Sequence, residues 1–497
     1  MNEIHFVDTT LRDGQQSLWA LGMKTDAMLG AAAPMDQIGF ESAEFFVSIM
    51  IKKYVRELKE NPWTWLRQGR KLFRRTRQRN HGGLHGSGAM EKLPQSAMKL
   101  FAERVVSYGV TLTRTSNCWN DFDELRGEVN ELRELGMDTV VNLIYSVSPR
   151  HTDAYYAQKA REAAAIAPYR ICFKDVGGLL TPERARTLIP AILQNAGKVP
   201  VEYHAHCNNG LAPLCYLEAI KHGITALHTA IPPLANGSSQ PSILNMARNL
   251  RALGYIPAVD KQAVNPVVEH FSTIAKRDGL AIGKPFAYDE SQYMHQVPGG
   301  VISNLRHQLK LIGKEDKLAE TLEEAARVRA DFGYPIMVTP LSQFVVSQAA
   351  INVIVGERYK EVTDQVIQYA LGYWGKEAPA LLDPDIKDKI LSRGRAKEWE
   401  NWTPPDLSLS EVRQKLGTTV SDEELLLRVY AGPQAVDALL CDGAPEPNLD
   451  AKRPLMELIE VLSKKKDCRQ IYIRRDGFSL TLGKSINSPG NHGENTG

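Results

Sequence analysis

The sequence predicts an α/β fold: a (β/α)8 TIM barrel followed by a mostly helical domain and a small α+β C-terminal module. Short apolar runs rich in β-branched residues recur through the first 235 residues and alternate with stretches of helical periodicity. The repeating unit is about 30 residues long, so eight units fill the roughly 250 residues of such a barrel. Beyond about residue 290 the pattern changes to helices.

Seven of the eight expected strands are short, mostly apolar runs. They cover residues 4–8, 42–47, 111–116, 138–147, 169–176, 200–207 and 225–231. The third strand is expected within 74–90, although this stretch is glycine-rich and basic. The basic run 70–79 is expected to form the exposed face of a helix.

Helical periodicity fills the intervals between the strands, for example over 121–136 and 181–197. Thr181 is a suitable N-cap for the second of these helices, and Pro182 suits its first turn. Regular alternation of strand and helix along the chain is the pattern of a parallel barrel.

Four segments follow from these patterns. Residues 1–290 are expected to form the barrel with a metal site, and 291–402 a helical domain that completes the active site. A proline-bearing linker near 400–410 leads to the module 403–486, which ends in two alternating runs typical of a hairpin. Residues 487–497 are expected to be disordered.

Composition excludes several classes of function. The formal net charge is +2 with a pI of about 8.1, so no overall field argues for nucleic acid or a membrane surface as the partner. The six cysteines are scattered, and no apolar run approaches the roughly 20 residues of a membrane span. The N-terminus lacks the features of a signal peptide, so a cytoplasmic location is expected.

Three strand ends carry groups that can do chemistry. His204 and His206 lie two residues apart, which points both imidazoles to one face of a strand, and Asp13 follows the first strand. Together they form a possible site for Zn, Mn or Co; the alternative is a hydrogen-bonded pair without metal. Lys174 ends the sixth strand, either as an ion-pair partner or as a lysine of lowered pKa that reacts with CO2 to a carbamate.

Six motifs connect these residues to a known family. They are DTTLRDGQQSL (8–18), ICFKDVGGLLTP (171–182), HAHCNNG (204–210), ANGSSQPS (235–242), VPGGVISNL (297–305) and VTPLS (338–342). The chain resembles the carboxyltransferase subunits of biotin-dependent carboxylases, represented by pyruvate carboxylase, the oxaloacetate decarboxylase alpha subunit and the transcarboxylase 5S subunit. These belong to a wider superfamily of metal-dependent TIM-barrel lyases and synthases.

The resemblance implies the roles of individual residues. By the family's pattern the metal ligands are Asp13, carbamylated Lys174, His204 and His206. Arg12 and Gln16 are implied to line the region of the substrate and the biotin carboxyl group, and Thr339 to relay a proton. Such a set is chemically sensible, because an enolate needs a Lewis acid, hydrogen-bond donors and a proton carrier.

The resemblance also implies partners. Biotin would arrive on another polypeptide, because no Met-Lys-Met-type biotinyl motif follows the barrel. A biotin carboxyl carrier protein and a biotin carboxylase subunit are therefore expected as separate partners of a homo-oligomer, with a small molecule as the carboxyl acceptor.

The chain departs from the family's pattern in its third and fourth strands. The arginine that pairs with the substrate carboxylate in pyruvate-type members falls near Gly83, and Asn117 replaces an aspartate. A carboxylate clamp contributes about 1.5–3 kcal/mol, so an acceptor other than pyruvate is possible. His81 and His85 are either substitute donors in the pocket or residues of a mobile glycine-rich loop, and Asn117 is a further candidate for substrate binding.

Three functions are compatible with the sequence. The first is a carboxyltransferase acting between carboxybiotin and an enolisable acceptor similar to pyruvate or oxaloacetate. The second is a metal-dependent aldol or Claisen-type lyase or synthase acting on an acyl-CoA. The third is a non-catalytic scaffold subunit of a carboxylase complex, although the intact metal-ligand set argues against it.

Overall fold

The structure is a computed structural model that describes residues 3–84, 93–403, 406–441, 462, 470–475 and 478–483. Contacts divide the chain into two compact units, Met1–Pro445 and Glu446–Gly497. In the second unit β10 (Gln470–Arg475) and β11 (Phe478–Gly483) form an antiparallel hairpin, as their alternating sequence predicts. The segment expected to be disordered, 487–497, lies outside the described residues.

Parallel strands of the first unit close into a barrel, which confirms the predicted fold class. Each strand pairs with its neighbours in chain order, and β1 closes the sheet by pairing with both β8 and β2. The strands are β1 (Glu3–Asp8), β2 (Ser42–Val47), β3 (Arg77–His81), β4 (Leu112–Thr115), β5 (Asp138–Ile144), β6 (Arg170–Asp175), β7 (Val201–Ala205) and β8 (Ala226–Thr229). A short strand β9 (Ile256–Pro257) extends the sheet beside β1.

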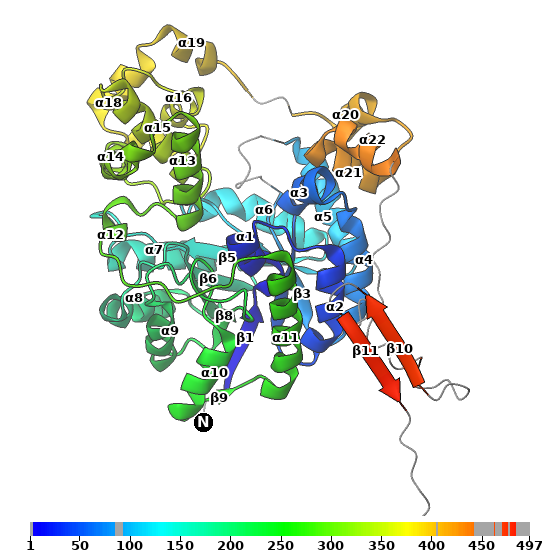
Figure 1. Cartoon of the computed structure of the whole chain (residues 1–497). Helices are drawn as coiled ribbons and strands as arrows, with labels where there is room; N and C mark the ends of the chain where they lie inside the picture. The colour runs from blue at the N-terminus through cyan, green and yellow to red at the C-terminus, as the bar shows by residue number, and fades with distance from the viewer. Residues whose placement is uncertain are drawn as a thin grey trace, which may run out of the picture. The chain divides into compact units, whose positions relative to one another are not determined.

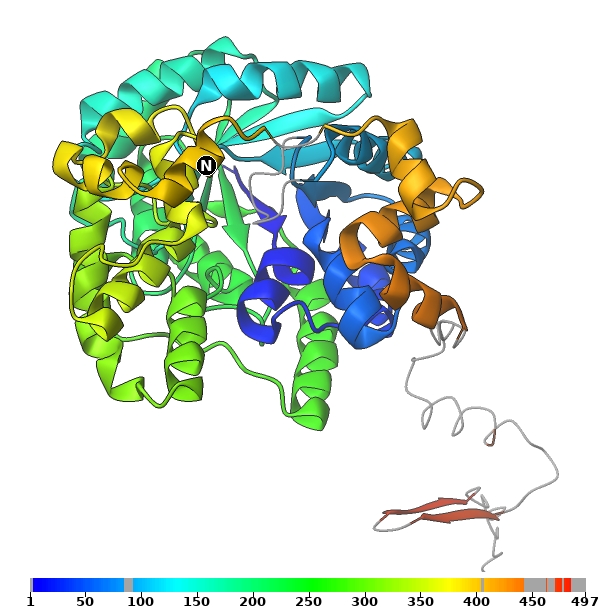
Figure 2. The ribbon, with the colours of Figure 1, turned by 90° about the horizontal axis from the view of Figure 1, so that it is seen from above.

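Helices alternate with the strands and surround the barrel (Figure 2). They are α1 (Gln15–Trp19), α2 (Thr25–Asp36), α3 (Ile49–Lys53), α4 (Pro62–Leu72), α5 (Gln95–Ser107), α6 (Phe122–Glu134), α7 (Asp153–Ala165), α8 (Pro182–Asn195), α9 (Ala212–Lys221), α10 (Ile243–Ala252) and α11 (Lys261–Asp278). Thr181 caps α8 as predicted, since its side chain accepts the backbone N–H of Arg184. A polar residue before the helix thus helps to set where it begins.

The expected exposed helix over 70–79 is wrong for its second half. Helix α4 ends at Leu72, and strand β3 begins at Arg77. Arg79 points into the barrel, where it is 1% exposed and donates two hydrogen bonds to Glu202 of β7, at 2.5 and 3.1 Å. A basic strand is therefore buried because the opposite strand supplies the matching carboxylate.

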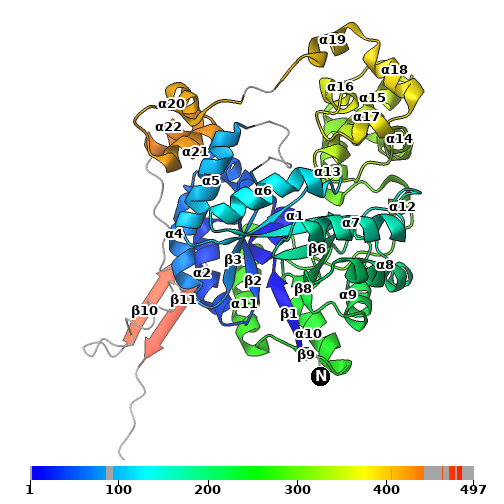
Figure 3. The same cartoon turned by 180° about the vertical axis from the view of Figure 1, so that it is seen from behind.

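A second group of helices has a hydrophobic core of its own. It contains α12 (Gln292–His295), α13 (Gly299–Leu311), α14 (Leu318–Asp331), α15 (Leu341–Val355), α16 (Asp364–Ala370), α17 (Ala378–Leu381), α18 (Pro384–Leu391) and α19 (Gly394–Glu400). Trp119, from the loop after β4, joins this core and donates to the carbonyl of Trp374 at 2.8 Å. Figures 1 and 3 show these helices at the end of the barrel where the strands finish.

Three later helices pack directly on the barrel. They are α20 (Leu409–Leu416), α21 (Asp422–Ala431) and α22 (Pro433–Cys441). Helix α21 contacts α3 and α5. Apolar residues of α20, α21 and α22 belong to the barrel's core cluster. The segment expected as one module over 403–486 is thus divided at residue 445 between the two compact units. No helix among the described residues is long and apolar enough to cross a membrane.

Replacing Arg79 with methionine is expected to destabilise the protein by about 3–5 kcal/mol, because Glu202 would remain charged and buried without its main partner. Arg77 lies on the same strand, but its ion pair with Asp138 is partly exposed. The variant Arg77→Met should therefore cost at most about 1 kcal/mol. Urea unfolding measures both changes, and equal losses from the two variants would contradict the assignment of the buried pair.

Candidate metal centre and active-site cavity

A cavity of about 750 Å³ opens at the end of the barrel where the strands finish. Its walls come from the loops after β1, β2, β3, β4, β6 and β7, from the start of α13 and from the loop before α15. The residues of the expected site that line it are Arg12, Asp13, Gln16, His81, Lys174, His206 and Thr339. Segments far apart in the sequence therefore meet at the place where barrel enzymes carry their active sites.

Arg12 and Asp13 are placed by the first turn after β1. Residues Thr10–Gly14 form a single π-helical turn in which both side chains are buried. The Asp8 carboxylate ends the strand and accepts hydrogen bonds from the backbone N–H and the hydroxyl of Thr10, at 3.1 and 2.5 Å. This local bonding holds the turn so that its polar side chains face the barrel mouth.

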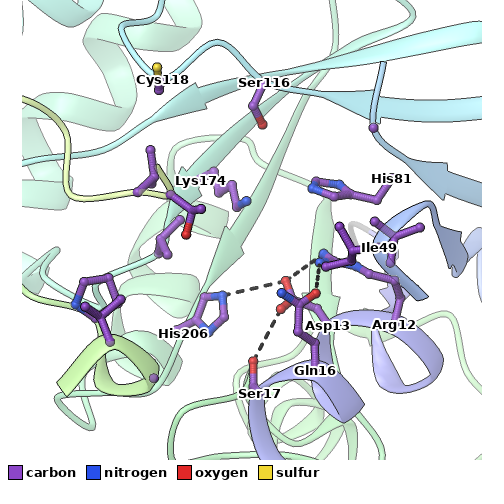
Figure 4. A pocket seen from close by; sticks show the side chains of 18 of the residues that line it. Arg12, Asp13, Gln16, Ser17, Ile49, His81, Ser116, Cys118, Lys174 and His206 are labelled. Carbon is purple, nitrogen blue, oxygen red and sulfur yellow. Dashed lines mark hydrogen bonds and ion pairs between the residues drawn. The ribbon is translucent and has the colours of Figure 1, made fainter. Parts of the chain in front are cut away.

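Asp13 lies beside both imidazoles that the HxH spacing places on one face of β7. Its Oδ2 atom is 3.2 Å from Nε2 of His204 and 3.7 Å from Nε2 of His206. The candidate ligand atoms of these three residues lie within 4.8 Å of one another. Figure 4 shows Asp13 and His206 facing each other from opposite walls. His204 is fully buried beneath the cavity floor.

The protonation of these groups suits a divalent metal. Burial lowers the pKa of both histidines, so both imidazoles are neutral near pH 7. Burial alone would raise the pKa of Asp13, but the Arg12 guanidinium beside it holds this pKa well below its usual range. The Nδ1 atom of His206 is 2.6 Å from the Ser238 carbonyl, which only accepts, so the proton is on Nδ1 and the lone pair on Nε2.

A carboxylate oxygen and an imidazole lone pair that face each other repel unless a cation or a hydrogen-bond donor lies between them. The Gln240 amide is such a donor, with Nε2 3.2 Å from Nε2 of His206, and a divalent cation would serve the carboxylate and both imidazoles at once. The donor set of one carboxylate and two neutral imidazoles matches the preferences of Zn, Mn and Co. The residues present therefore fit the divalent metal that the sequence predicts.

Lys174 belongs to the same face of the barrel. It is the register partner of His204 in the parallel β6–β7 pair, and its side chain points into the cavity (Figure 4). Burial, together with the positive charge of Arg114, lowers the pKa of Lys174 to about 8. The amine therefore loses its proton far more readily than an exposed lysine does.

Arg12 is held by a buried ionic network that the sequence did not predict. Its guanidinium donates to Glu44 at 2.7 Å, to Asp13 at 2.8 Å and to the side-chain oxygen of Gln16 at 3.2 Å. Glu44 is fully buried and also forms an ion pair with Arg114. The sequence offered one signal for Glu44 and Arg114. Each is a charged residue in the middle of a short, buried strand, SAEFFV and LTRT respectively.

His81 ends β3 and lines the cavity, while His85 lies outside the described residues. Burial lowers the pKa of His81 well below its usual range, and its buried Nδ1 atom has no hydrogen-bond partner among the described residues. A neutral imidazole with an unused ring nitrogen can bond to a ligand but does not replace an arginine's charge.

The position of the missing arginine is closed. A Cβ atom on Gly83 would lie 1.8 Å from the Oε1 atom of Glu128, a distance that no side chain tolerates. Glu128 is itself buried and accepts a hydrogen bond from Thr115 at 2.5 Å. This wall therefore offers the acceptor a glycine backbone and no cationic side chain at that point.

Asn117 is used by its own loop. Its side-chain oxygen accepts the backbone N–H groups of Trp119 and Asp121, at 2.8 and 3.1 Å, and its amide donates to Glu124. The neighbouring residues Ser116 and Cys118 line the cavity, whereas Asn117 is absent from its walls. The structure thus gives Asn117 a part in shaping the loop after β4.

The walls include residues that the sequence did not single out. Lys52 of α3, Tyr430 of α21 and Gln343 of α15 line the cavity, together with Gly299 and Gly300 of the motif over 297–305. Tyr430 was missed because it lies in the last helices of the first unit, far along the chain from every motif. Tyr430 reaches the cavity because α21 packs on the barrel, and the hydrophobic periodicity of a helix does not show what the helix packs against.

A closed (β/α)8 barrel with a carboxylate and two neutral imidazoles at its strand ends is the architecture of metal-dependent barrel enzymes. Two family models match the chain. The HMGL-like model matches residues 3–270, and the conserved carboxylase domain model matches residues 293–438.

Known proteins extend the match over nearly the whole chain. A pyruvate carboxylase subunit of Methanocaldococcus jannaschii is 34% identical over 92% of this chain and 81% of its own length. The 2-oxoglutarate carboxylase large subunit of Hydrogenobacter thermophilus is 31% identical over 92% of this chain and 72% of its own length. The chain belongs to the family of carboxyltransferase subunits of biotin-dependent carboxylases, as its motifs predict.

Solved structures agree on the fold. The carboxyl transferase domain of Rhizobium etli pyruvate carboxylase with pyruvate has a TM-score of 0.78 and 21% identity, and the match covers 99% of this chain and 85% of that one. Both the barrel and the helices that follow it are therefore common to the two folds.

The variant Asp13→Asn is expected to lose its bound metal, because it keeps the side chain's size but removes the negative charge that balances the cation. Elemental analysis of the purified protein measures the metal content, with circular dichroism as the check on folding. Asp153→Asn, at the start of α7 and away from the cavity lining, is the control and should keep the wild-type content. Full metal occupancy in Asp13→Asn would show that the site is elsewhere.

Proposed function

We propose that this biotin-dependent carboxyltransferase moves a carboxyl group between carboxybiotin and a small 2-oxo acid, with pyruvate and 2-oxoglutarate as the first candidates. The observation that carries the proposal is the charge of the cavity. Among the described residues, its lining includes the cationic side chains of Arg12 and Lys52 and one carboxylate, that of Asp13, and a divalent metal bound beside Asp13 would add positive charge. A cavity of this sign attracts an anionic acceptor, and the names of the two relatives supply the candidates.

The acceptor's carboxylate is proposed to bind on the α3 side of the cavity. A side chain at Gly83 on the β3 side would meet Glu128, whereas Lys52 lines the cavity from α3. On this proposal, the acceptor's carboxylate is bound from the α3 side of the cavity instead of from the β3 side.

Lys174 is proposed to carry a carbamate and to act as a further ligand of the metal. Its lowered pKa favours the neutral amine that attacks CO2, and its register partner is the candidate ligand His204. A divalent metal bound at this site would act as a Lewis acid for the enolate oxygen of the acceptor. Asp13, His204 and His206 would complete the ligand set.

Proton transfer and stabilisation of the oxyanion are proposed for other side chains that line the cavity. The acceptor loses a proton from the carbon next to its carbonyl, and the same carbon forms a bond to CO2 released from the biotin nitrogen. The Thr339 hydroxyl is proposed to carry that proton to the nitrogen. Arg12 and Gln16 are proposed to donate hydrogen bonds to the oxyanion; Gln16 accepts from Arg12 through its oxygen, which leaves its amide free to donate.

Biotin is proposed to reach the cavity on a carrier protein that is charged by a separate biotin carboxylase. Both relatives are named as single subunits of their enzymes, which is consistent with work shared among polypeptides. The match to the conserved carboxylase domain over residues 293–438 favours carboxyl transfer over an acyl-CoA lyase or a scaffold. Assembly of several copies of the chain stays a prediction.

Free biotin should stimulate the decarboxylation of oxaloacetate or oxalosuccinate, the carboxylated forms of the two candidate acceptors. The variant Lys52→Met should raise the KM for the preferred substrate by about tenfold or more, since a charge-assisted contact is lost, and Lys52→Arg should restore it. Steady-state kinetics measure both effects.

Thr339→Ala is the matched control for chemistry in this assay and should lower kcat while leaving KM largely unchanged. Biotin-independent cleavage of an acyl-CoA, with no stimulation by biotin on either oxaloacetate or oxalosuccinate, would overturn the proposed function.

Lys174 should gain the mass of one CO2 molecule when the protein is kept in bicarbonate near pH 8.5. The sign follows from its pKa of about 8, since the reactive neutral amine increases as the pH rises through that value. Native mass spectrometry with peptide mapping measures the adduct, and Lys174→Arg is the control that cannot form it. An unmodified Lys174 in the metal-loaded protein at this pH would contradict the proposed carbamate.

A further inference from the structure

Two fully buried residues lie behind the candidate metal ligand His204. They are His228 of β8 and Glu202 of β7, and neither lines the cavity. The Nδ1 atom of His228 is 3.0 Å from Nδ1 of His204, and its Nε2 atom is 2.9 Å from Oε1 of Glu202. The three side chains therefore form a linear chain of hydrogen bonds that ends at the metal site.

Glu202 fixes the direction of this chain. Arg79 donates to both of its carboxylate oxygens, at 2.5 and 3.1 Å. Arg79 is always cationic and is only 1% exposed, so Glu202 is the carboxylate that balances its buried charge. A carboxylate in this form only accepts hydrogen bonds, so the proton between the two groups is on Nε2 of His228.

The remaining protons follow from the geometry of a metal-bound His204. A metal shared with Asp13 would bind Nε2 of His204, which faces the Asp13 carboxylate, so the proton of this ring would be on Nδ1. Nδ1 of His204 then donates across the 3.0 Å contact to Nδ1 of His228, while Nε2 of His228 donates to Glu202. The lone pair of His204 is then on Nε2, which faces Asp13 at 3.2 Å.

The two candidate histidine ligands are thus oriented by different means. His206 donates from Nδ1 to the backbone carbonyl of Ser238. The Nδ1 atom of His204 faces the imidazole of His228 instead of a carbonyl. The tautomer of His204 therefore depends on Glu202, which bonds to the far side of His228. Partners that fix the tautomer of a metal-bound histidine commonly affect metal affinity by roughly 10- to 100-fold.

We propose that His228 and Glu202 are positioning residues of the metal centre, which hold His204 in the tautomer that presents Nε2 to a divalent metal. The inference rests on the metal site of Asp13, His204 and His206. It is independent of the identity of the acceptor, because its test measures metal binding alone.

Two substitutions at residue 228 separate tautomer control from packing. His228→Leu removes the acceptor for the Nδ1 proton of His204, which is then free to move to Nε2 and block the metal. The expected result is a dissociation constant for Zn²⁺ that is about 10- to 100-fold higher. His228→Asn places an amide oxygen near the position of Nδ1 and should stay within about threefold of the wild type.

Competition with a chromophoric chelator measures the Zn²⁺ affinities, and the visible spectrum of the Co²⁺-substituted protein reports the ligand geometry. Tyr216→Phe is the matched control. Its hydroxyl bridges the same two strands, donating to the carbonyl of His228 at 2.8 Å and accepting from the backbone N–H of Ala205 at 2.9 Å, but it does not touch the imidazoles. This variant should lower Tm and leave the affinity for Zn²⁺ unchanged.

The proposal is overturned if His228→Leu binds Zn²⁺ as tightly as the wild type, or if His228→Asn binds as weakly as His228→Leu. Nitrogen-15 NMR of the histidines in the wild-type protein without metal gives a second test that needs no variant. A proton on Nδ1 of His204 and on Nε2 of His228 supports the relay. The opposite pair of tautomers rejects it, even if His228→Leu fails to fold.

Discussion

The candidate site depends on keeping the Asp13 carboxylate ionised at a place where it is only 5% exposed. A lone carboxylate would take up a proton there, because burial disfavours charge. Arg12 supplies the compensating charge at 2.8 Å, and Arg12 is itself held by Glu44, which pairs in turn with Arg114. The interior of the barrel is therefore a connected set of ion pairs, and metal ligation, the lowered pKa of Lys174 and the cavity's charge all depend on it.

Much of the fold could be predicted from the sequence because strand and helix have different periods. Seven apolar runs coincide with strands β1, β2 and β4–β8, and Thr181 begins α8 as its residue type predicts. Sites at the ends of parallel strands follow once the strands are placed, which is why Asp13, Lys174 and His206 could be expected to converge. Strand β3 escaped the apolar pattern because Arg79 is buried by pairing with Glu202.

The residues behind the ligands could not be predicted in the same way. Glu44, Arg114 and His228 meet only because closure of the sheet brings β2, β4 and β8 to one axis, and the strand register decides which atoms touch. Asn117 is an error of the opposite kind. Its side chain was expected to face the substrate, but it bonds to the backbone of the loop after β4. Sequence motifs locate the atoms that do chemistry better than the atoms that hold them.

The wall contributed by Tyr430 has a consequence for biosynthesis. Its ring lies against the cavity from α21, a helix made long after the metal ligands have left the ribosome. One wall of the chamber is therefore synthesised after every candidate ligand of the metal. The catalytic chamber becomes complete only when the last helices of the first unit dock on α3 and α5.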